Sequence, residues 1–238
     1  MPVIFPAMNT IWFWFDKKTR RMLHGTPDDC MRKYEAFTEK NIPLAGFEIF
    51  LMPSRLKNID QFNSAFYRAF SRLNCRTVHI GESKPDFLNT DPAIHDQLSL
   101  LAQVLQRLEA DTLILHAHHL KKGRPKIRKI FSSTLPGVDI CVENNGFDDE
   151  WGNSLEGLRS IFIDCPELKF CLDIAHVKDF NNGHCLDDFL AEELLTSRLK
   201  DIHFSYSTIL LDSEPYAARG YPGYTPYHAL FALIGLSP

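Results

Sequence analysis

The sequence lacks paired cysteines: none of its six cysteine residues stands in a C-x-x-C motif. The cysteines are spread widely along the chain, and Cys75, Cys141 and Cys171 fall in or beside apolar runs, where cysteine is usually a small buried hydrophobic residue. This pattern is not that of a disulfide framework. We predict reduced thiols in a cytoplasmic protein.

The sequence also lacks a long apolar run and an excess of basic residues. The apolar segment MPVIFPAMNTIWFWF is interrupted by two prolines and Asn9, has no basic start and is too short to span a membrane, so we expect neither a signal peptide nor a membrane anchor. The formal net charge is −4 and the pI is about 6.2. A protein built mainly to hold DNA is more often basic, so the charge weighs against nucleic acid as a partner without excluding it.

The composition, with 45% hydrophobic and 24% charged residues in 238, is that of a globular protein with a sizeable core. Linkers and low-complexity tracts are missing, so we predict a single domain over residues 1–238.

What the sequence does contain is a regular alternation of apolar runs and amphipathic segments. The runs that we expect to be strands occupy residues 44–52, 76–82, 111–119, 138–144, 168–176 and 200–207, with an earlier candidate at 9–15. The expected helices occupy residues 58–73, 91–110, 124–135, 154–165 and 185–199. Continuous apolar runs are typical of parallel strands buried on both faces. The alternation therefore predicts βα units and an α/β fold.

Polar side chains recur near the carboxyl ends of five successive expected strands. They are His79, His116, Glu143, Asp173 and His203, and they follow one another at about the 30-residue length of a βα unit. In a (β/α)8 barrel the carboxyl ends of the strands converge on one site. No glycine-rich phosphate fingerprint follows the early strands, which disfavours an open dinucleotide-binding sheet. We therefore predict a TIM-type (β/α)8 barrel with a divalent-metal site of nitrogen and oxygen ligands.

Each of these residues also has a purely structural interpretation. A single histidine at a strand end is more often structural than a ligand, and an aspartate there is often a helix N-cap. Five such residues in phase are harder to explain in that way, and a shared metal site is the better hypothesis.

Four short motifs, FEIF (47–50), ICVEN (140–144), CLDIAH (171–176) and DIHFSYS (201–207), resemble strands of the xylose isomerase-like TIM-barrel superfamily. That superfamily includes sugar isomerases, sugar epimerases and endonuclease IV. The resemblance covers the chain from about residue 44 onward. It implies metal ligands at Glu143, Asp173 and His203, an Asp-x-x-His pair completed by His176, and a site-lining carboxylate at Glu48.

The resemblance leaves two branches open. In the isomerase and epimerase branch one metal binds sugar oxygens. Glu143 acts there both as a metal ligand and as a general base, and His176 contacts the substrate. In the endonuclease branch a zinc cluster activates a water molecule that attacks a phosphodiester. His79, His116 and His176 are further ligands of that cluster, and His228 matches a ligand near the C-terminal end of the family's sequence. Pro226 stands where the aspartate of the usual Asp-x-His would be, and no eighth strand with its final glutamate ligand follows HALFALIGL. The barrel is then incomplete at its C-terminal strand, or the sequence is truncated.

Further candidates surround the expected site. Lys121, with its basic neighbours, is a candidate phosphate contact. Strand alternation predicts that the side chain of His118 points to the same side as that of His116 and that the side chain of His119 points to the opposite side. Asn144 and Asn145 suit either a substrate hydroxyl or turn chemistry. Arg219 lies in a glycine- and proline-rich loop that suits an anion clamp.

Taken together, the sequence favours a divalent-metal-dependent isomerase or epimerase acting on a sugar, sugar phosphate or similar polyol, with one to three ions, Mn or Zn being the first choices. The alternatives are an endonuclease IV-like zinc phosphodiesterase and a barrel that has lost its activity. A small-molecule substrate is the expected partner, and an open barrel edge would invite a homo-oligomer.

Overall fold

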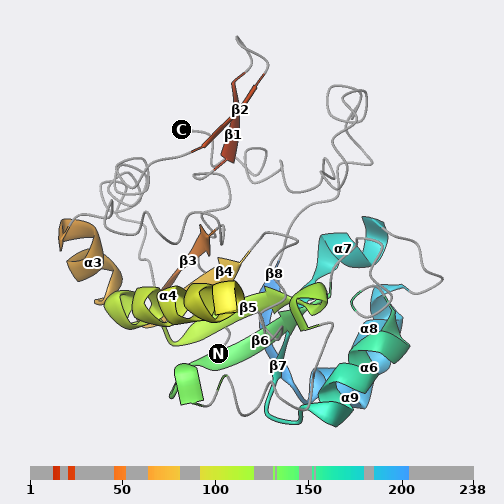
Figure 1. The fold of residues 1–238 in the computed structure, drawn as a ribbon. Helices are drawn as coiled ribbons and strands as arrows, with labels where there is room; N and C mark the ends of the chain where they lie inside the picture. The colour runs from red at the N-terminus through yellow and green to blue at the C-terminus, as the bar shows by residue number, and fades with distance from the viewer. Residues whose placement is uncertain are drawn as a thin grey trace. The chain divides into compact units, whose positions relative to one another are not determined.

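The computed structural model of the chain describes residues 13–16, 21–24, 46–51, 64–80, 92–120, 131, 133–144, 152, 154–179 and 185–203 (Figure 1). The chain divides into two compact units. The first comprises residues 1–115 and 129–139, and the second comprises residues 116–128 and 140–238. Each unit contributes consecutive parallel strands that are connected through helices.

The first unit is built on the parallel strands β3 (Gly46–Leu51), β4 (Cys75–Ile80) and β5 (Thr112–His116). Helix α3 (Ser64–Phe70) connects β3 to β4, and α4 (Pro92–Leu108) connects β4 to β5. Figure 1 draws α4 alongside β4 and β5. The side chains of Val78, Leu101 and Leu113 are fully buried, as expected for strands and a helix that share one core. Helix α4 begins at Pro92, where the sequence predicted the first helical position.

The second unit is built on the parallel strands β6 (Asp139–Glu143), β7 (Lys169–Asp173) and β8 (Leu199–His203). Its helices are the 3-10 turn η2 (Ala117–Leu120), α6 (Leu155–Asp164), α7 (Ile174–Asp179), α8 (Leu186–Ala191) and α9 (Glu193–Thr196). Helix α6 begins after Ser154, whose Oγ accepts a hydrogen bond from the backbone N–H of Gly157. Leu158 and Phe162 of α6 are fully buried, together with Phe170 of β7.

The parallel strands follow one another in chain order with a helix between successive strands, so the predicted α/β class is confirmed. This is the repeating unit of the predicted (β/α)8 barrel, of which the described residues supply six parallel strands. The segment HALFALIGL, after which no eighth strand was expected, lies outside the described residues. A single domain over residues 1–238 remains a prediction.

The prediction for residues 9–15 was wrong in one respect. Residues 13–16 do form a strand, β1 (Phe13–Asp16), but it pairs with β2 (Arg21–His24) in a separate antiparallel sheet of two strands. The connection between β1 and β2 is only four residues long. A connection of that length permits a hairpin, whereas a parallel neighbour needs a crossover of a dozen or more residues.

Four other segments differ from their expected form. The runs at 111–119 and 168–176 end as strands at His116 and Asp173, and η2 and α7 follow directly. The expected helix at 185–199 is divided into α8 and α9 by Glu192, whose backbone is extended and whose Oε1 accepts a hydrogen bond from the N–H of Leu194. Strand β8 is not buried on both faces, because Ile202 is 47% exposed.

Among the helices that the structure describes, none combines the length and the apolar character needed to cross a lipid bilayer.

Candidate metal centre

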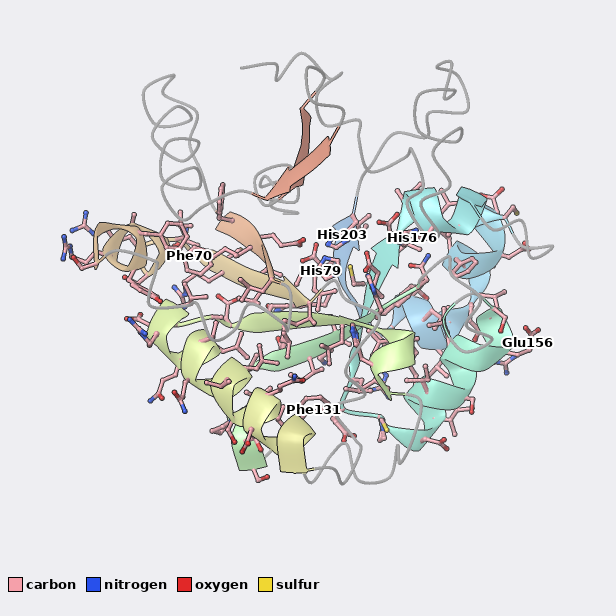
Figure 2. The ribbon with its side chains drawn as sticks, turned by 45° about the horizontal axis from the view of Figure 1, so that its top comes forward. Phe70, His79, Phe131, Glu156, His176 and His203 are labelled. Atoms are coloured by element: carbon pink, nitrogen blue, oxygen red, sulfur yellow. The ribbon has the colours of Figure 1, made fainter. Side chains whose placement is uncertain are left out.

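Four side chains of the candidate centre stand at the last residues of four parallel strands. His116 ends β5, Glu143 ends β6, Asp173 ends β7 and His203 ends β8, and all four belong to the second unit. Asp173 and His203 are partners in the β7–β8 register. Figure 2 shows His203 and His176 near the ends of β8 and β7. Parallel strands place their carboxyl ends at one edge of the sheet, and the apolar runs behind these residues therefore position the polar groups together.

Glu143 bridges two histidines. Its Oε1 lies 2.6 Å from Nδ1 of His203, and its Oε2 lies 2.7 Å from Nε2 of His116. A carboxylate only accepts hydrogen bonds, so His203 donates its Nδ1–H to Oε1, whereas His116 makes a close ion-pair contact with Oε2. The side chain of Glu143 is 1% exposed. Charge-assisted contacts of this length are the strong kind, and they favour one orientation of each ring.

Asp173 has two functions, one for each carboxylate oxygen. Its Oδ1 accepts a hydrogen bond of 3.0 Å from the backbone N–H of His176, which caps the first turn of α7. Its Oδ2 lies 3.8 Å from Nε2 of His176 and 3.8 Å from Nδ1 of His203. The structural interpretation of Asp173 as a helix cap and its interpretation as a ligand are therefore both supported by the geometry.

Asn144 holds the backbone at Asp173. The Asn144 side chain donates through Nδ2 to the carbonyl oxygen of Asp173 at 2.9 Å and accepts through Oδ1 from its N–H at 2.7 Å. This pair of hydrogen bonds extends the β6–β7 pairing by one step beyond the end of β6. The expected role of Asn144 toward a substrate hydroxyl gives way to this positioning role, because both polar groups of its amide are engaged with backbone.

The side chains of Glu143, Asp173 and His176 are suited to hold a cation. Each offers one ligand atom, the three atoms lie within 4.8 Å of one another, and all three residues are buried. Two buried carboxylates carry negative charge into a poorly solvated place, and a divalent ion would offset that charge. Oxygen and nitrogen donors of this kind suit zinc or manganese. The residues present therefore fit a metal ion.

Cys171 lies beside this cluster, on the same face of β7 as Asp173. One ligand atom from each of Glu143, Cys171 and His203 falls within 4.8 Å of the others. Burial raises the pKa of the Cys171 thiol well above its usual range, against the opposing effects of the charge of His203 and of a side-chain hydrogen bond with it. In the absence of a metal the sulfur is therefore a protonated thiol.

His119 was missed by the sequence reasoning. It was expected to face away from His116, but its ring stacks on that of His116 with centroids 5.7 Å apart, and its Nδ1 accepts the backbone N–H of His116 at 3.1 Å. The strand alternation used for the prediction does not apply, because η2 begins at Ala117. The short polar run AHHL after an apolar strand was the only local signal of that turn.

In the first unit, two further candidates form a pair of their own. Nδ1 of His79 on β4 lies 3.2 Å from Oε1 of Glu48 on β3, and both side chains are buried. A buried carboxylate beside an imidazole is a strong polar pair. The metal ligation expected of His79 and the substrate contact expected of Glu48 remain predictions.

The other predicted site residues lie outside the part of the chain that the structure describes. They are Lys121, Asn145, Arg219 and His228, together with the side chain of His118.

Comparison with known proteins gives likenesses of fold only. No protein-family model matches the sequence, and no curated protein matches it. The solved structures with a similar fold include the TTHB071 protein from Thermus thermophilus, soaked with ZnCl2, at 20% identity and a TM-score of 0.42, over 64% of this chain and 65% of that one. A D-tagatose 3-epimerase-like protein matches at 17% identity and a TM-score of 0.48, over 68% of this chain and 67% of that one.

A third similar structure, AsfvAP:AG, matches at 14% identity and a TM-score of 0.46, over 74% of this chain and 61% of that one. The chain spans 61% to 67% of the length of these three proteins, and less than two thirds of the first.

Proposed function

We propose that the protein is a divalent-metal-dependent enzyme that isomerises or epimerises a sugar, a sugar phosphate or a similar polyol. The observation that carries the proposal is the buried group of Glu143, Asp173 and His176 at the carboxyl ends of the strands, with His203 hydrogen-bonded to the same glutamate. Such a group leaves coordination positions free on the ion. Neighbouring hydroxyl and carbonyl oxygens of a sugar are ligands that can fill them. The motifs at residues 140–144, 171–176 and 201–207 resemble a superfamily that contains such enzymes, and they are equally compatible with its hydrolase branch.

In this proposal Glu143, Asp173 and His176 would hold the ion, which would supply a Lewis acid for a carbonyl or hydroxyl oxygen of the substrate. Glu143 combines ligation with proton transfer at carbon, and its two histidine partners hold it in one rotamer. His176 is placed to contact the substrate, because the cap at Asp173 fixes the first turn of α7. Burial of the carboxylates keeps water from competing for the transferred proton.

A second candidate is a zinc phosphodiesterase of the endonuclease IV kind. Five ligand-type side chains gather in the second unit, namely His116, Glu143, Asp173, His176 and His203. A zinc ion takes four ligands, so five side chains with a shared carboxylate favour more than one ion. The net charge of −4 disfavours a nucleic-acid substrate. The third alternative, a barrel without activity, predicts bound metal without turnover.

Elemental analysis together with two activity assays separates these functions. The purified protein is loaded with Mn²⁺ or Zn²⁺, and its metal content is measured. It is then incubated with a panel of ketoses, aldoses and their phosphates in deuterated water. Uptake of deuterium at carbon, with one ion per chain, supports the proposal. Two or three zinc ions with cleavage of abasic-site DNA support the hydrolase instead.

The variant Glu143→Gln tests whether the activity depends on Glu143, and Glu167→Gln is the matched control. Glu167 carries the same charge but is exposed in the turn before β7. Deuterium uptake that disappears in Glu143→Gln and persists in Glu167→Gln is the expected result. A protein that binds no metal under any loading condition overturns the metal-dependent function altogether.

A further inference from the structure

Cys171 differs from the other buried cysteines of the described chain in its neighbours. Cys141, Cys165 and Cys171 are all buried, and the ordinary role of such a residue is to fill apolar space. Among the described residues, however, only Cys171 belongs to a group of potential metal ligands. Its sulfur points toward a carboxylate and an imidazole instead of aliphatic side chains alone.

The strand register explains this placement. Cys171 precedes Asp173 by two residues on β7, so both side chains project from the same face of the sheet. In the β6–β7 register Cys171 is the partner of Glu143, the residue that bridges His116 and His203. The thiol therefore lies one step below Asp173 along the strand, at the base of the candidate centre.

The distances between ligand atoms join the sulfur to the centre. The ligand atoms of Glu143, Cys171 and His203 all lie within 4.8 Å of one another. Ligands of a tetrahedral zinc ion lie about 3.5 Å apart, given bonds of roughly 2.0 Å to nitrogen and 2.3 Å to sulfur. Shifts of about 1 Å, within reach of side-chain rotation, would bring all three atoms onto one ion.

We propose that Cys171 is a sulfur ligand of the metal centre, together with Glu143 and His203, so that the centre takes zinc in preference to manganese or magnesium. The inference rests on the proposed metal-dependent function and specifies its ion. A thiolate is a soft ligand that zinc accepts and that magnesium and manganese sites seldom use. On binding, the S–H bond of Cys171 breaks, a sulfur–metal bond forms, and the proton passes to the solvent.

The inference is tested by titrating the metal-free full-length chain with Co²⁺, the spectroscopic substitute for zinc. Visible d–d bands report that the ion binds, and a separate near-ultraviolet charge-transfer band reports a bond to sulfur. The variants are Cys171→Ser and the control Cys141→Ser, which alters an equally buried thiol two residues before Glu143. We expect both bands in the unaltered protein and in Cys141→Ser. We expect only the d–d bands in Cys171→Ser.

The outcomes distinguish this inference from the function on which it rests. If the unaltered protein shows d–d bands without a sulfur band, or if Cys171→Ser keeps the sulfur band, the sulfur ligand is refuted while the metal-dependent function stands. If no Co²⁺ or Zn²⁺ binds at all, both fail.

Two further measurements keep the test independent of how well Cys171→Ser folds. X-ray absorption at the zinc edge of the unaltered protein should show a sulfur neighbour at about 2.3 Å. Competition titrations should show that Cys171→Ala weakens zinc binding on the order of tenfold more than manganese binding. A zinc edge with only nitrogen and oxygen neighbours would refute the inference.

Discussion

Substitution of Glu143 by glutamine gives the sharpest test of the centre, because it removes one charge and changes almost no volume. Oε1 of Glu143 is hydrogen-bonded to Nδ1 of His203 at 2.6 Å, and Oε2 lies in an ion-pair contact 2.7 Å from Nε2 of His116. The amide of glutamine offers one oxygen and one NH2 group, so its NH2 group faces one of these two ring nitrogens. At least one of the two charge-assisted contacts is therefore lost at a fully buried position.

The expected cost in the metal-free protein is about 2–4 kcal/mol of unfolding free energy, from one lost bond and the weakening of the other when the charge disappears. The larger expected effect concerns the ion. At a free metal concentration of about 100 times Kd, binding to the native state stabilises it by about 2.7 kcal/mol, which for a chain of this length raises Tm by roughly 5–10 °C. Glu143→Gln should abolish most of that rise.

The measurement is thermal unfolding in EDTA and in zinc, for the unaltered protein, Glu143→Gln and Glu167→Gln. Glu167 is exposed, so its variant should unfold within about 0.5 kcal/mol of the unaltered protein and keep the zinc-induced rise. A rise in Glu143→Gln equal to that of the control would refute the reasoning, since it would show that Glu143 is not a ligand.

Three further predictions address neighbouring residues. Asp173→Asn should keep the cap on α7 and lose the zinc-induced rise in Tm, whereas Asp173→Ala should cost about 1 kcal/mol more in urea unfolding, since asparagine caps helices and alanine does not. Asn144→Ala should lower the unfolding free energy by about 2–4 kcal/mol in urea titrations, because two buried backbone groups of Asp173 lose their partner; a cost under about 0.5 kcal/mol would contradict this. Burial raises the pKa of the Cys171 thiol, so the folded metal-free protein keeps this proton when the unfolded chain loses it above about pH 8.5. Stability should then fall by up to about 1.4 kcal/mol per pH unit above that point, and Cys171→Ala should reduce the slope in urea titrations between pH 8 and 10.

The sequence predicted the centre through a spacing, and that spacing was informative because a βα unit has a nearly constant length. Glu143 and Asp173 follow apolar runs whose ends are the ends of their strands in the structure. Continuous apolar runs fix where a parallel strand lies, and the sheet then fixes which residues are neighbours. The strand-end positions of His116, Glu143, Asp173 and His203 could therefore be predicted without any long-range information.

The orientation of the side chains could not be predicted in the same way. His176 was placed in a strand and lies in α7, and His119 was directed away from His116 and stacks on it. In both cases the predicted strand extended past the residue at which the strand ends in the structure, so strand alternation does not apply to the residues beyond it. What ends β7 is the cap at Asp173, a single hydrogen bond that competes with strand pairing.

The cap at Asp173 also limits how the centre can hold an ion. Oδ1 is committed to the backbone N–H of His176, so Asp173 offers the ion one oxygen, Oδ2, unless α7 loses its first-turn bond. Glu143 has one oxygen directed to each of two histidines, and the ring N–H of His203 occupies the position between its Oε1 and the Oδ2 of Asp173. Glu143, Asp173 and His203 would hold a cation there, and the proton on Nδ1 of His203 would be released to the solvent. Because the strand ends already hold these three side chains, such an exchange would need no change of fold. Cys171, whose ligand atom lies within 4.8 Å of those of Glu143 and His203, is placed to add a further donor.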